Sequence, residues 1–356
     1  MRKLYRCISF LLILLLCFLT TQVRLGFRDD LGSQQVFREY YALPSHTVDV
    51  VCIGTSAVQR GWISPIAYKR HGIASYSLAT ASQPFCLAKH IMKEAIRTQK
   101  PKVFVIDLRG AMKNPGDMHD SFIRRVTDNM SDSLVRWTAI NEALSYIGPD
   151  NEEIDVDDIS YYIKLAKYHE LYNPAKIPKE VGVVYYSGFA YYEPTYYMIK
   201  PQRDVGPQEK SMKIDKECKN ILNDLLDYCD TIDSKVVFTL MPFAGSRKQL
   251  RKLNTVASIV EKRGYDCINF MDYEHRVGQG MDYSKIFYNR NHTNYYGSKK
   301  ITTYICRYLR KNYNLPNRKL DIRNGAWDES SKAFSSVTKE KRREMYNKIK
   351  RREKRK

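Results

Sequence analysis

Short apolar runs alternate along this chain with segments in which apolar residues recur every third or fourth position. The apolar runs predict buried strands at 48–53, 73–78, 102–108, 235–241 and 266–270. The periodic segments predict amphipathic helices at 84–98, 214–232, 253–263 and 297–313. Because strands that alternate with helices form parallel sheets covered on both faces, the pattern predicts an α/β fold, doubly wound around a mostly parallel five-stranded sheet.

The alternation stops between the third and fourth predicted strands. Residues 111–210 form an insert far longer than a usual connection, with an acidic stretch at 150–158 and a cluster of tyrosines. We predict that this insert is a cap over the carboxyl edge of the sheet, where open α/β sheets bind ligands. Tyr191, Tyr192 and Tyr196 are candidates for stacking on a sugar ring. The alternative is that the tyrosines pack the cap itself.

The N-terminal part of the chain is apolar. The segment at 7–23 carries no charge and follows three basic residues, which is typical of a membrane-spanning helix with a cytoplasmic N-terminus. We therefore predict a single-pass anchor in the cell membrane at 1–28, a linker at 29–47, and an extracytoplasmic location for the bulk of the chain. A cleaved signal peptide is the alternative, and it leaves the compartment unchanged.

Charge concentrates at the other end. The chain has 59 Lys and Arg against 39 Asp and Glu, and 11 basic and 3 acidic residues fall within 339–356. We predict that 316–356 is a basic tail, either a solvated helix or disordered, suited to anionic wall polymer or lipid headgroups. No nucleic-acid-binding motif accompanies the charge, so no nucleic-acid partner is expected. The eight cysteines lack C-x-x-C spacing, which argues against a metal site.

A serine and a histidine carry the candidate chemistry. Gly54-Thr55-Ser56 directly follows the first predicted strand, so the Ser56 hydroxyl lies at the tip of the sheet and is a candidate nucleophile. His292 lies in a polar loop before the last predicted helix and is the candidate base. The alternatives are a chance Gly-x-Ser and a loop histidine bonded to a carbonyl. Only the fold can bring the two residues together.

Three segments resemble sequence blocks of the SGNH hydrolases, also called GDSL-type esterases. The tetrapeptide that ends at Ser56 resembles the first block, 77–84 is similar to the second, and 287–297 resembles the last. The resemblance implies an SGNH-like domain at 48–315. Within this family, the chain resembles the membrane-anchored branch of bacterial envelope proteins. That branch includes the D-alanyl transfer protein of teichoic acid synthesis and partners of membrane-bound O-acyltransferases.

The resemblance also implies roles for single residues. Ser56 is the nucleophile, His292 is the base, and the backbone N–H groups of Ser56 and Ala79 form the oxyanion hole. Asn289 occupies the third position of the triad, where the family has aspartate. An asparagine oxygen can accept from the imidazole, as in Cys-His-Asn enzymes. Asp282, seven residues upstream, is the candidate substitute acid.

The implied function is extracytoplasmic, serine-dependent acyl transfer or ester hydrolysis on a cell-envelope glycan or polymer, without a cofactor. A membrane-bound O-acyltransferase is the implied partner. The alternative is a non-catalytic protein that binds acylated polymer or scaffolds such an acyltransferase. Asn289, Ala79 in place of the family's glycine, and the lack of the family's asparagine at 241–246 favour this alternative.

Overall fold

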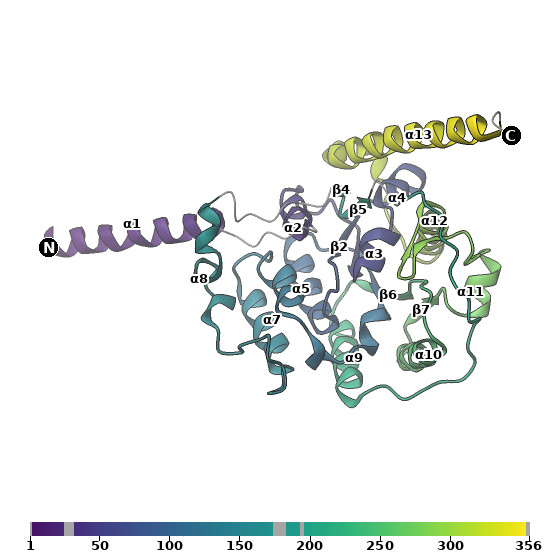
Figure 1. The fold of residues 1–356 in the computed structure, drawn as a ribbon. Coiled ribbons are helices and arrows are strands. Elements are labelled where there is room, and N and C mark those ends of the chain that lie inside the picture. The colour runs from purple at the N-terminus through teal and green to yellow at the C-terminus, as the bar shows by residue number, and fades with distance from the viewer. Residues whose placement is uncertain (1, 25–31, 174–182, 193–195, 354–356) are drawn as a thin grey trace.

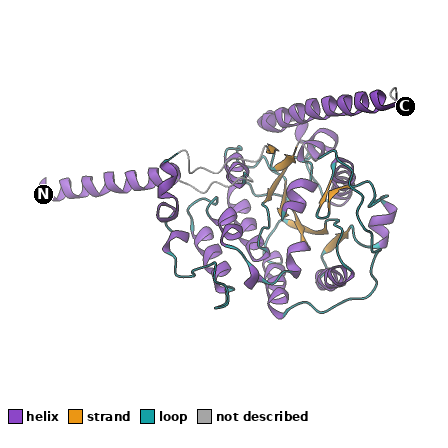
Figure 2. Cartoon of the chain, in the orientation of Figure 1, coloured by secondary structure: helices purple, strands orange, loops and turns teal. Residues whose placement is uncertain are grey.

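The computed structural model describes residues 2–24, 32–173, 183–192 and 196–353. Its centre is a five-stranded sheet in which all neighbouring strands run parallel (Figure 2). The strands are β1 (Val50–Gly54), β2 (Ser75–Ala79), β3 (Val103–Asp107), β6 (Lys235–Leu240) and β7 (Asp266–Asn269). Their ends agree with the predicted strands to within two residues, so the predicted sheet is confirmed.

Helices cover both faces of this sheet (Figure 1). On one face α4 (Ser64–His71) packs against α12 (Tyr295–Asn312). The other face carries α5 (Ala88–Thr98), α9 (Lys216–Cys229) and α10 (Arg247–Lys262). Since both faces are covered, β1, β2 and β3 are buried along their whole length. The short α11 (Tyr273–Gly278) follows β7.

The helix α10 begins six residues before the predicted start at 253. The reason is a capping box. The Ser246 side chain accepts a hydrogen bond from the Gln249 N–H, and the Gln249 side chain accepts one from the Ser246 N–H. Together they satisfy two N–H groups that a helix start leaves open, so the helix extends beyond its apolar stripe.

The strand order places a crevice at one point of the sheet. The order is β2-β1-β3-β6-β7, so the chain leaves β1 toward one side and later returns to its other side at β3. The connections therefore diverge between the carboxyl ends of β1 and β3, and open α/β sheets bind ligands at such a point. Ser56 lies two residues after the end of β1, and Arg109 lies two residues after the end of β3.

The insert at 111–210, predicted to be a cap over the carboxyl edge, consists of two parts that pack in different places. Its first part contains α6 (Asp120–Thr127), α7 (Leu134–Ser145) and α8 (Lys164–Tyr168). Of these, α6 packs on α7, and α7 packs on α5. Apolar side chains of α6 and α7 are buried, so these helices extend the helical layer that α5 begins.

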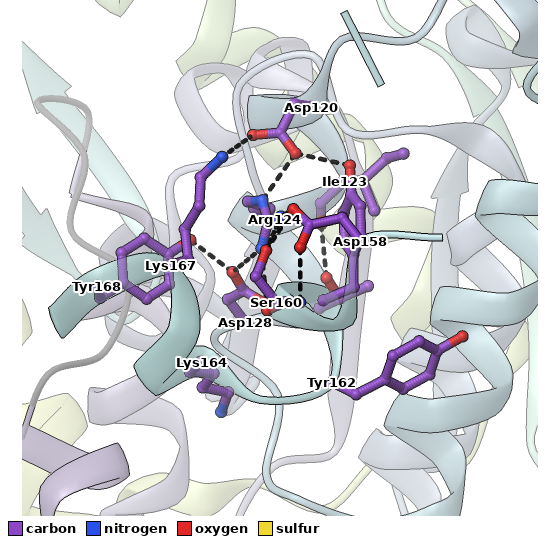
Figure 3. Close-up of polar contacts among 12 residues, drawn as sticks. Asp120, Ile123, Arg124, Asp128, Asp158, Ser160, Tyr162, Lys164, Lys167 and Tyr168 are labelled. Carbon is purple, nitrogen blue, oxygen red and sulfur yellow. Dashed lines mark hydrogen bonds and ion pairs between the residues drawn. The ribbon is translucent and has the colours of Figure 1, made fainter. Parts of the chain in front are cut away.

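Paired charges hold this first part together (Figure 3). The side chains of Arg124, Arg136 and Asp128 are at most 1% exposed. Asp128 Oδ2 lies 3.3 Å from Arg124 Nη1, and its Oδ1 lies 3.2 Å from Arg136 Nη2. Tyr168 donates to Asp128, and Asp158 from the acidic stretch pairs with Arg124. Because each buried charge has partners, the network fixes how α6, α7 and α8 meet.

The second part of the insert forms a hairpin, β4 (Val183–Tyr186) and β5 (Phe189–Tyr192). Its two turn residues, Ser187 and Gly188, have positive φ angles of 52° and 77°, which is the turn that suits a twisted hairpin. Ser77 N–H donates to Ser187 O, and a Cβ on Gly188 would lie 2.3 Å from Ser77 O. The hairpin turn thus covers the outer edge of β2, the side on which no other strand of the central sheet pairs with it.

The predicted linker at 29–47 contains a packed helix. This helix, α2 (Ser33–Tyr41), buries Val36, Phe37 and Tyr40. Tyr76 of β2 donates a hydrogen bond from its hydroxyl to Val36 O at 2.7 Å. The expectation of a plain linker was therefore wrong for 33–41, because three apolar side chains on one helical face bury against the sheet.

The two ends of the chain are helical. In the described chain, α1 (Arg2–Arg24) is the one helix that is long and apolar enough to cross a membrane, and its apolar side chains are exposed. At the other end, α13 (Gly325–Glu353) begins on the body, where Trp327 donates from Nε1 to Ser75 O at 3.0 Å and Phe334 is buried. The predicted tail at 316–356 is thus partly a packed element.

Candidate active site

A tight turn at the end of β1 positions Ser56. Gly54 has a φ of 155°, and a Cβ there would lie 2.7 Å from Val58 and 2.9 Å from Asp107, so only glycine fits. Thr55 caps the next helix, α3 (Ser56–Gly61), because its side chain accepts from Ala57 N–H. Ser56 is the first residue of α3 and is half-buried. It lies at the tip of the sheet, as the sequence predicted.

A short hairpin positions His292. Strands β8 (Phe287–Asn289) and β9 (His292–Thr293) pair antiparallel, with Asn289 opposite His292. Asn294 then caps α12, since its side chain accepts from the N–H groups of Tyr296 and Gly297. The Asn294 amide also donates to Lys285 O at 2.7 Å. These bonds fix the loop that carries His292 against the start of α12.

The fold brings Ser56 and His292 into contact across 236 residues. Ser56 Oγ lies 2.8 Å from His292 Nε2, and His292 Nδ1 lies 3.0 Å from Asn289 Oδ1. These are the nucleophile–base and base–orienter contacts of a catalytic triad. The structure therefore places the predicted nucleophile, base and third residue in one chain of hydrogen bonds.

The Asn289 amide determines which imidazole nitrogen carries the proton. Its Oδ1 also accepts the backbone N–H groups of Asn291 and His292, each at 2.9 Å. Because two N–H donors point at this atom, it is the oxygen and not the amide nitrogen that faces His292. His292 Nδ1 must then donate, which leaves the lone pair of Nε2 toward Ser56. This is the tautomer that a general base requires.

The surroundings of His292 oppose a charge on it. The Tyr288 ring stacks on the imidazole at 5.6 Å between centroids and 13° between planes. Burial, and then the positive charges of Arg60 and Arg109, lower the pKa of His292 to about 3. The imidazole is therefore neutral at ordinary pH, and it is a weaker base than a free histidine.

The sequence analysis missed the two arginines. Arg60 lies one helical turn after Ser56 and donates from Nη1 to Tyr288 Oη at 2.9 Å. Arg109 donates from Nη1 to Asn291 O at 3.1 Å, and its guanidinium lies 4.4 Å from the centre of the Phe243 ring. The available signal was their position just after the carboxyl ends of β1 and β3, where open sheets place functional residues.

Asp107 was also missed. It ends β3, is 1% exposed, and accepts from Met241 N–H at 3.0 Å through Oδ1. Its Oδ2 and the Oγ1 of Thr239, its neighbour on β6, are buried and have no hydrogen-bond partner within the described chain. Burial raises the pKa of Asp107 to about 6.

Ala79 lies at the predicted edge of the sheet. It is the last residue of β2, is fully buried, and pairs with Gly54 in the parallel register. Its backbone is thus level with the turn that carries Ser56.

Asp282 does not replace Asn289, so that prediction was wrong. Its side chain is exposed and its carboxylate bonds Ser284 and Lys285. These partners hold the pKa of Asp282 down, to about 2. The Asp282 carboxylate bonds only groups of its own turn before β8 among the described residues. The His292 imidazole is hydrogen-bonded to Asn289 instead.

Two of the three tyrosines proposed to contact substrate are buried. Tyr191 and Tyr196 are 2% and 1% exposed, and their rings pack edge to face at 5.5 Å. Both belong to an aromatic cluster with Phe189 and Phe334. They pack the insert against α13, as the alternative interpretation held. The side chain of Tyr192 lies outside the described residues.

A cavity of about 380 Å³ opens at the carboxyl edge of the central sheet, the edge at which Ser56 lies. Its walls include Gln83 and Phe85 after β2, Gly110 and Met112 after β3, and Phe122 of the insert. Ser56, His292 and Asn289 are not among its walls, but Gly110 directly follows Arg109, which bonds Asn291 O beside His292. Part of the insert therefore forms a side wall beside the site.

The residues that the structure describes hold no group of three or more His, Cys, Asp or Glu placed to bind a metal ion. Comparison of the chain with protein-family models, with curated proteins and with solved structures finds no match. The function is therefore inferred from the geometry of the site.

Proposed function

We propose that this chain is a membrane-anchored, serine-dependent acyl-transfer protein of the SGNH type, acting on esters of a cell-envelope glycan or polymer. The observation that carries the proposal is the hydrogen-bonded series Ser56 Oγ, His292 Nε2 and Nδ1, Asn289 Oδ1, at 2.8 and 3.0 Å. It joins a nucleophile, a base of the correct tautomer and an orienting group. Its position at the crevice between β1 and β3 supports ligand binding there.

The proposed reaction has two halves. Ser56 Oγ attacks the ester carbonyl carbon while His292 Nε2 takes the hydroxyl proton, and the backbone N–H groups of Ser56 and Ala79 hold the oxyanion. The carbon–oxygen bond to the alcohol then breaks, and the alcohol leaves with the proton from His292. In the second half, a sugar hydroxyl or water loses its proton to His292 and attacks the acyl-serine. Ser56 recovers that proton as the acyl group departs.

The proposed location is the outer side of the cell membrane. The helix α1 is long and apolar enough to span a bilayer, and basic residues precede its apolar run, which favours a cytoplasmic N-terminus. An envelope substrate and a membrane-bound O-acyltransferase partner suit a body tethered in this way. The direction of insertion is part of the proposal.

A second candidate function is binding without catalysis. Two observations favour it: an amide stands where an aspartate would strengthen the base, and the low pKa of His292 weakens it. In this case the site would hold an acylated polymer or support an acyltransferase, and Ser56 would not react.

Covalent labelling separates the two functions. We expect a fluorophosphonate, added to the full chain in detergent, to form one adduct, located at Ser56 by peptide mass spectrometry. Ser56→Ala should abolish the adduct. Ser64→Ala is the matched control, because Ser64 is a buried serine of the next helix, bonded to Ser187 O, and it should label as the natural chain does. Folded protein without a Ser56 adduct would favour the binding function.

A further inference from the structure

Two guanidinium groups are fixed to the segment that carries the base. Arg109 bonds Asn291 O and rests on the Phe243 ring. Arg60 bonds the hydroxyl of Tyr288, whose ring stacks on His292. One arginine comes from the helix that Ser56 begins, and the other comes from the segment after β3. The two charges therefore come from the segments after β1 and β3, which border the crevice, and both act on the imidazole.

The charge of Arg109 is not neutralised by an ion pair. Among the described residues, no carboxylate oxygen lies within 4.0 Å of its guanidinium. Asp107, two residues earlier, attracts the Arg109 charge from beyond ion-pair distance, and its Oδ1 accepts from Met241 N–H instead. Arg109 is half-buried, and only its Nη1 bonds a described protein atom. Its remaining N–H groups are therefore available to a ligand.

A planar fork of N–H donors is the protein's usual partner for carboxylate and phosphate groups. Burial beside a ring and a carbonyl holds the Arg109 fork in place, so little side-chain entropy is lost on binding. Lys113, one helical turn further on, adds a third positive charge and lines the adjoining cavity.

We propose that Arg109, together with Arg60, binds a negative charge carried by the substrate, next to the ester carbonyl carbon that Ser56 attacks. The inference rests on the proposed function and narrows its substrates to esters with a carboxylate or phosphate close to the reacting bond. A bound anion also offsets the two positive charges that weaken His292 as a base, so the correct substrate strengthens the base that it needs.

The test uses two matched pairs of esters with the full chain in detergent. For the acyl side, 4-nitrophenyl succinate carries a free carboxylate and its methyl ester does not. For the alcohol side, 4-acetoxybenzoate carries a carboxylate and methyl 4-acetoxybenzoate does not. We expect kcat/KM to favour the charged member of at least one pair by about tenfold or more, the effect of a charge-assisted hydrogen bond. The pair that shows the preference locates the anion.

Variants assign the preference to Arg109. Arg109→Gln should bring the charged-to-neutral ratio to about one, and Arg109→Lys should retain part of it. Arg290→Gln is the matched control, because Arg290 is an exposed arginine of the hairpin that Arg109 contacts and is bonded to Ala244 O. The charged-to-neutral ratio of this variant should not change. Equal losses on charged and neutral esters in Arg109→Gln would overturn the inference, since they indicate loop positioning or oxyanion binding.

Failure of the inference is distinct from failure of the proposed function. Ser56 labelling and neutral-ester turnover without a charge preference would remove the anion site and leave the acyl chemistry. If the chain turns over no ester, a binding measurement tests the inference instead. Calorimetry of Ser56→Ala with 4-nitrophenyl succinate should give binding that Arg109→Gln weakens about tenfold, and no binding would contradict the inference.

Discussion

At the scale of single residues, the amide at position 289 decides the chemistry of the histidine. An asparagine in place of the aspartate of a serine-protease triad costs about four orders of magnitude, because the imidazole takes the wrong tautomer. Here two backbone N–H groups hold the Asn289 oxygen toward His292, so the imidazole takes the right one. What the site lacks is the negative charge that would raise the pKa of the base.

Variants at Asn289 separate orientation from charge. We expect Asn289→Asp to keep the three hydrogen bonds, raise the pKa of His292 and speed phosphonylation of Ser56 by about tenfold, roughly one pKa unit of added base strength. Asn289→Ala removes the orienting oxygen and should slow it by about a thousandfold or more. Pseudo-first-order labelling rates measure both. An equally fast Asn289→Ala chain would show that the amide orients nothing.

The buried carboxyl group of Asp107 predicts a pH dependence of stability. Its pKa rises from 3.8 in the unfolded chain to about 6 in the folded one. Its contribution is therefore complete below pH 3.8 and is lost as pH rises through about 6. Asp107→Asn keeps the acceptor for Met241 N–H and carries no charge. Its free energy of unfolding should rise relative to the natural chain by about 2.5 kcal/mol between pH 4 and 7.

Denaturant unfolding in detergent at several pH values measures this difference. Asp282→Asn is the control of opposite sign, because the pKa of Asp282 is lowered to about 2 in the folded chain, so its stabilising effect appears above the unfolded pKa. A stability difference between Asp107→Asn and the natural chain that does not vary with pH would show that Asp107 is ionised alike in both states.

At the scale of elements, apolar patterning predicted the parts that two-sided burial controls. All five strands were found to within two residues, because a strand covered on both faces reads as an unbroken apolar run. The packed helix at 33–41 and the docked start of α13 were missed. Each buries only two or three large side chains, such as Phe37 and Trp327, and so few residues do not form a clear period in a polar sequence.

The docked start of α13 contributes to the stability of the body. Trp327 is 1% exposed and bonds Ser75 O of the central sheet, so Trp327→Ala should lower the free energy of unfolding by about 3–5 kcal/mol. Trp137→Ala is the matched control, because that ring is 51% exposed, and it should cost at most about 1 kcal/mol. Equal stabilities of the two variants would show that α13 does not pack on the sheet in solution.

At the scale of the whole molecule, one N-terminal helix joins an α/β body that brings Ser56, His292 and Asn289 together. The candidate nucleophile, base and third residue followed from sequence because they lie in short segments that resemble known sequence blocks. Arg60, Arg109 and Asp107 did not, because their roles depend on which strands are neighbours, and the strand order is a property of the complete fold. The packing of the insert was not predicted for the same reason, because the elements that it contacts are set by the complete fold.

We predict that deletion of residues 2–31 removes the membrane anchor and leaves the α/β body folded. Deletion of 2–31 removes α1 and keeps α2, so the chain should leave the membrane fraction and Ser56 should label at an unchanged rate. Deletion of 2–47 also removes the buried side chains of Val36, Phe37 and Tyr40, and should destabilise the body by several kcal/mol. Sedimentation with membranes, the rate of Ser56 labelling and thermal unfolding of the two deletion variants check these expectations. A 2–31 deletion that stays with the membrane would place the membrane contact elsewhere.

The most direct test of the account is the rate of Ser56 phosphonylation as a function of pH, with and without the histidine. Because the pKa of His292 is lowered to about 3, the account predicts a rate that stays level from pH 8 to about pH 4 and falls below it. In His292→Gln the rate should drop by about a thousandfold at every pH in that range. A His292→Gln chain that labels Ser56 as fast as the natural protein would contradict the claim that this imidazole activates this serine.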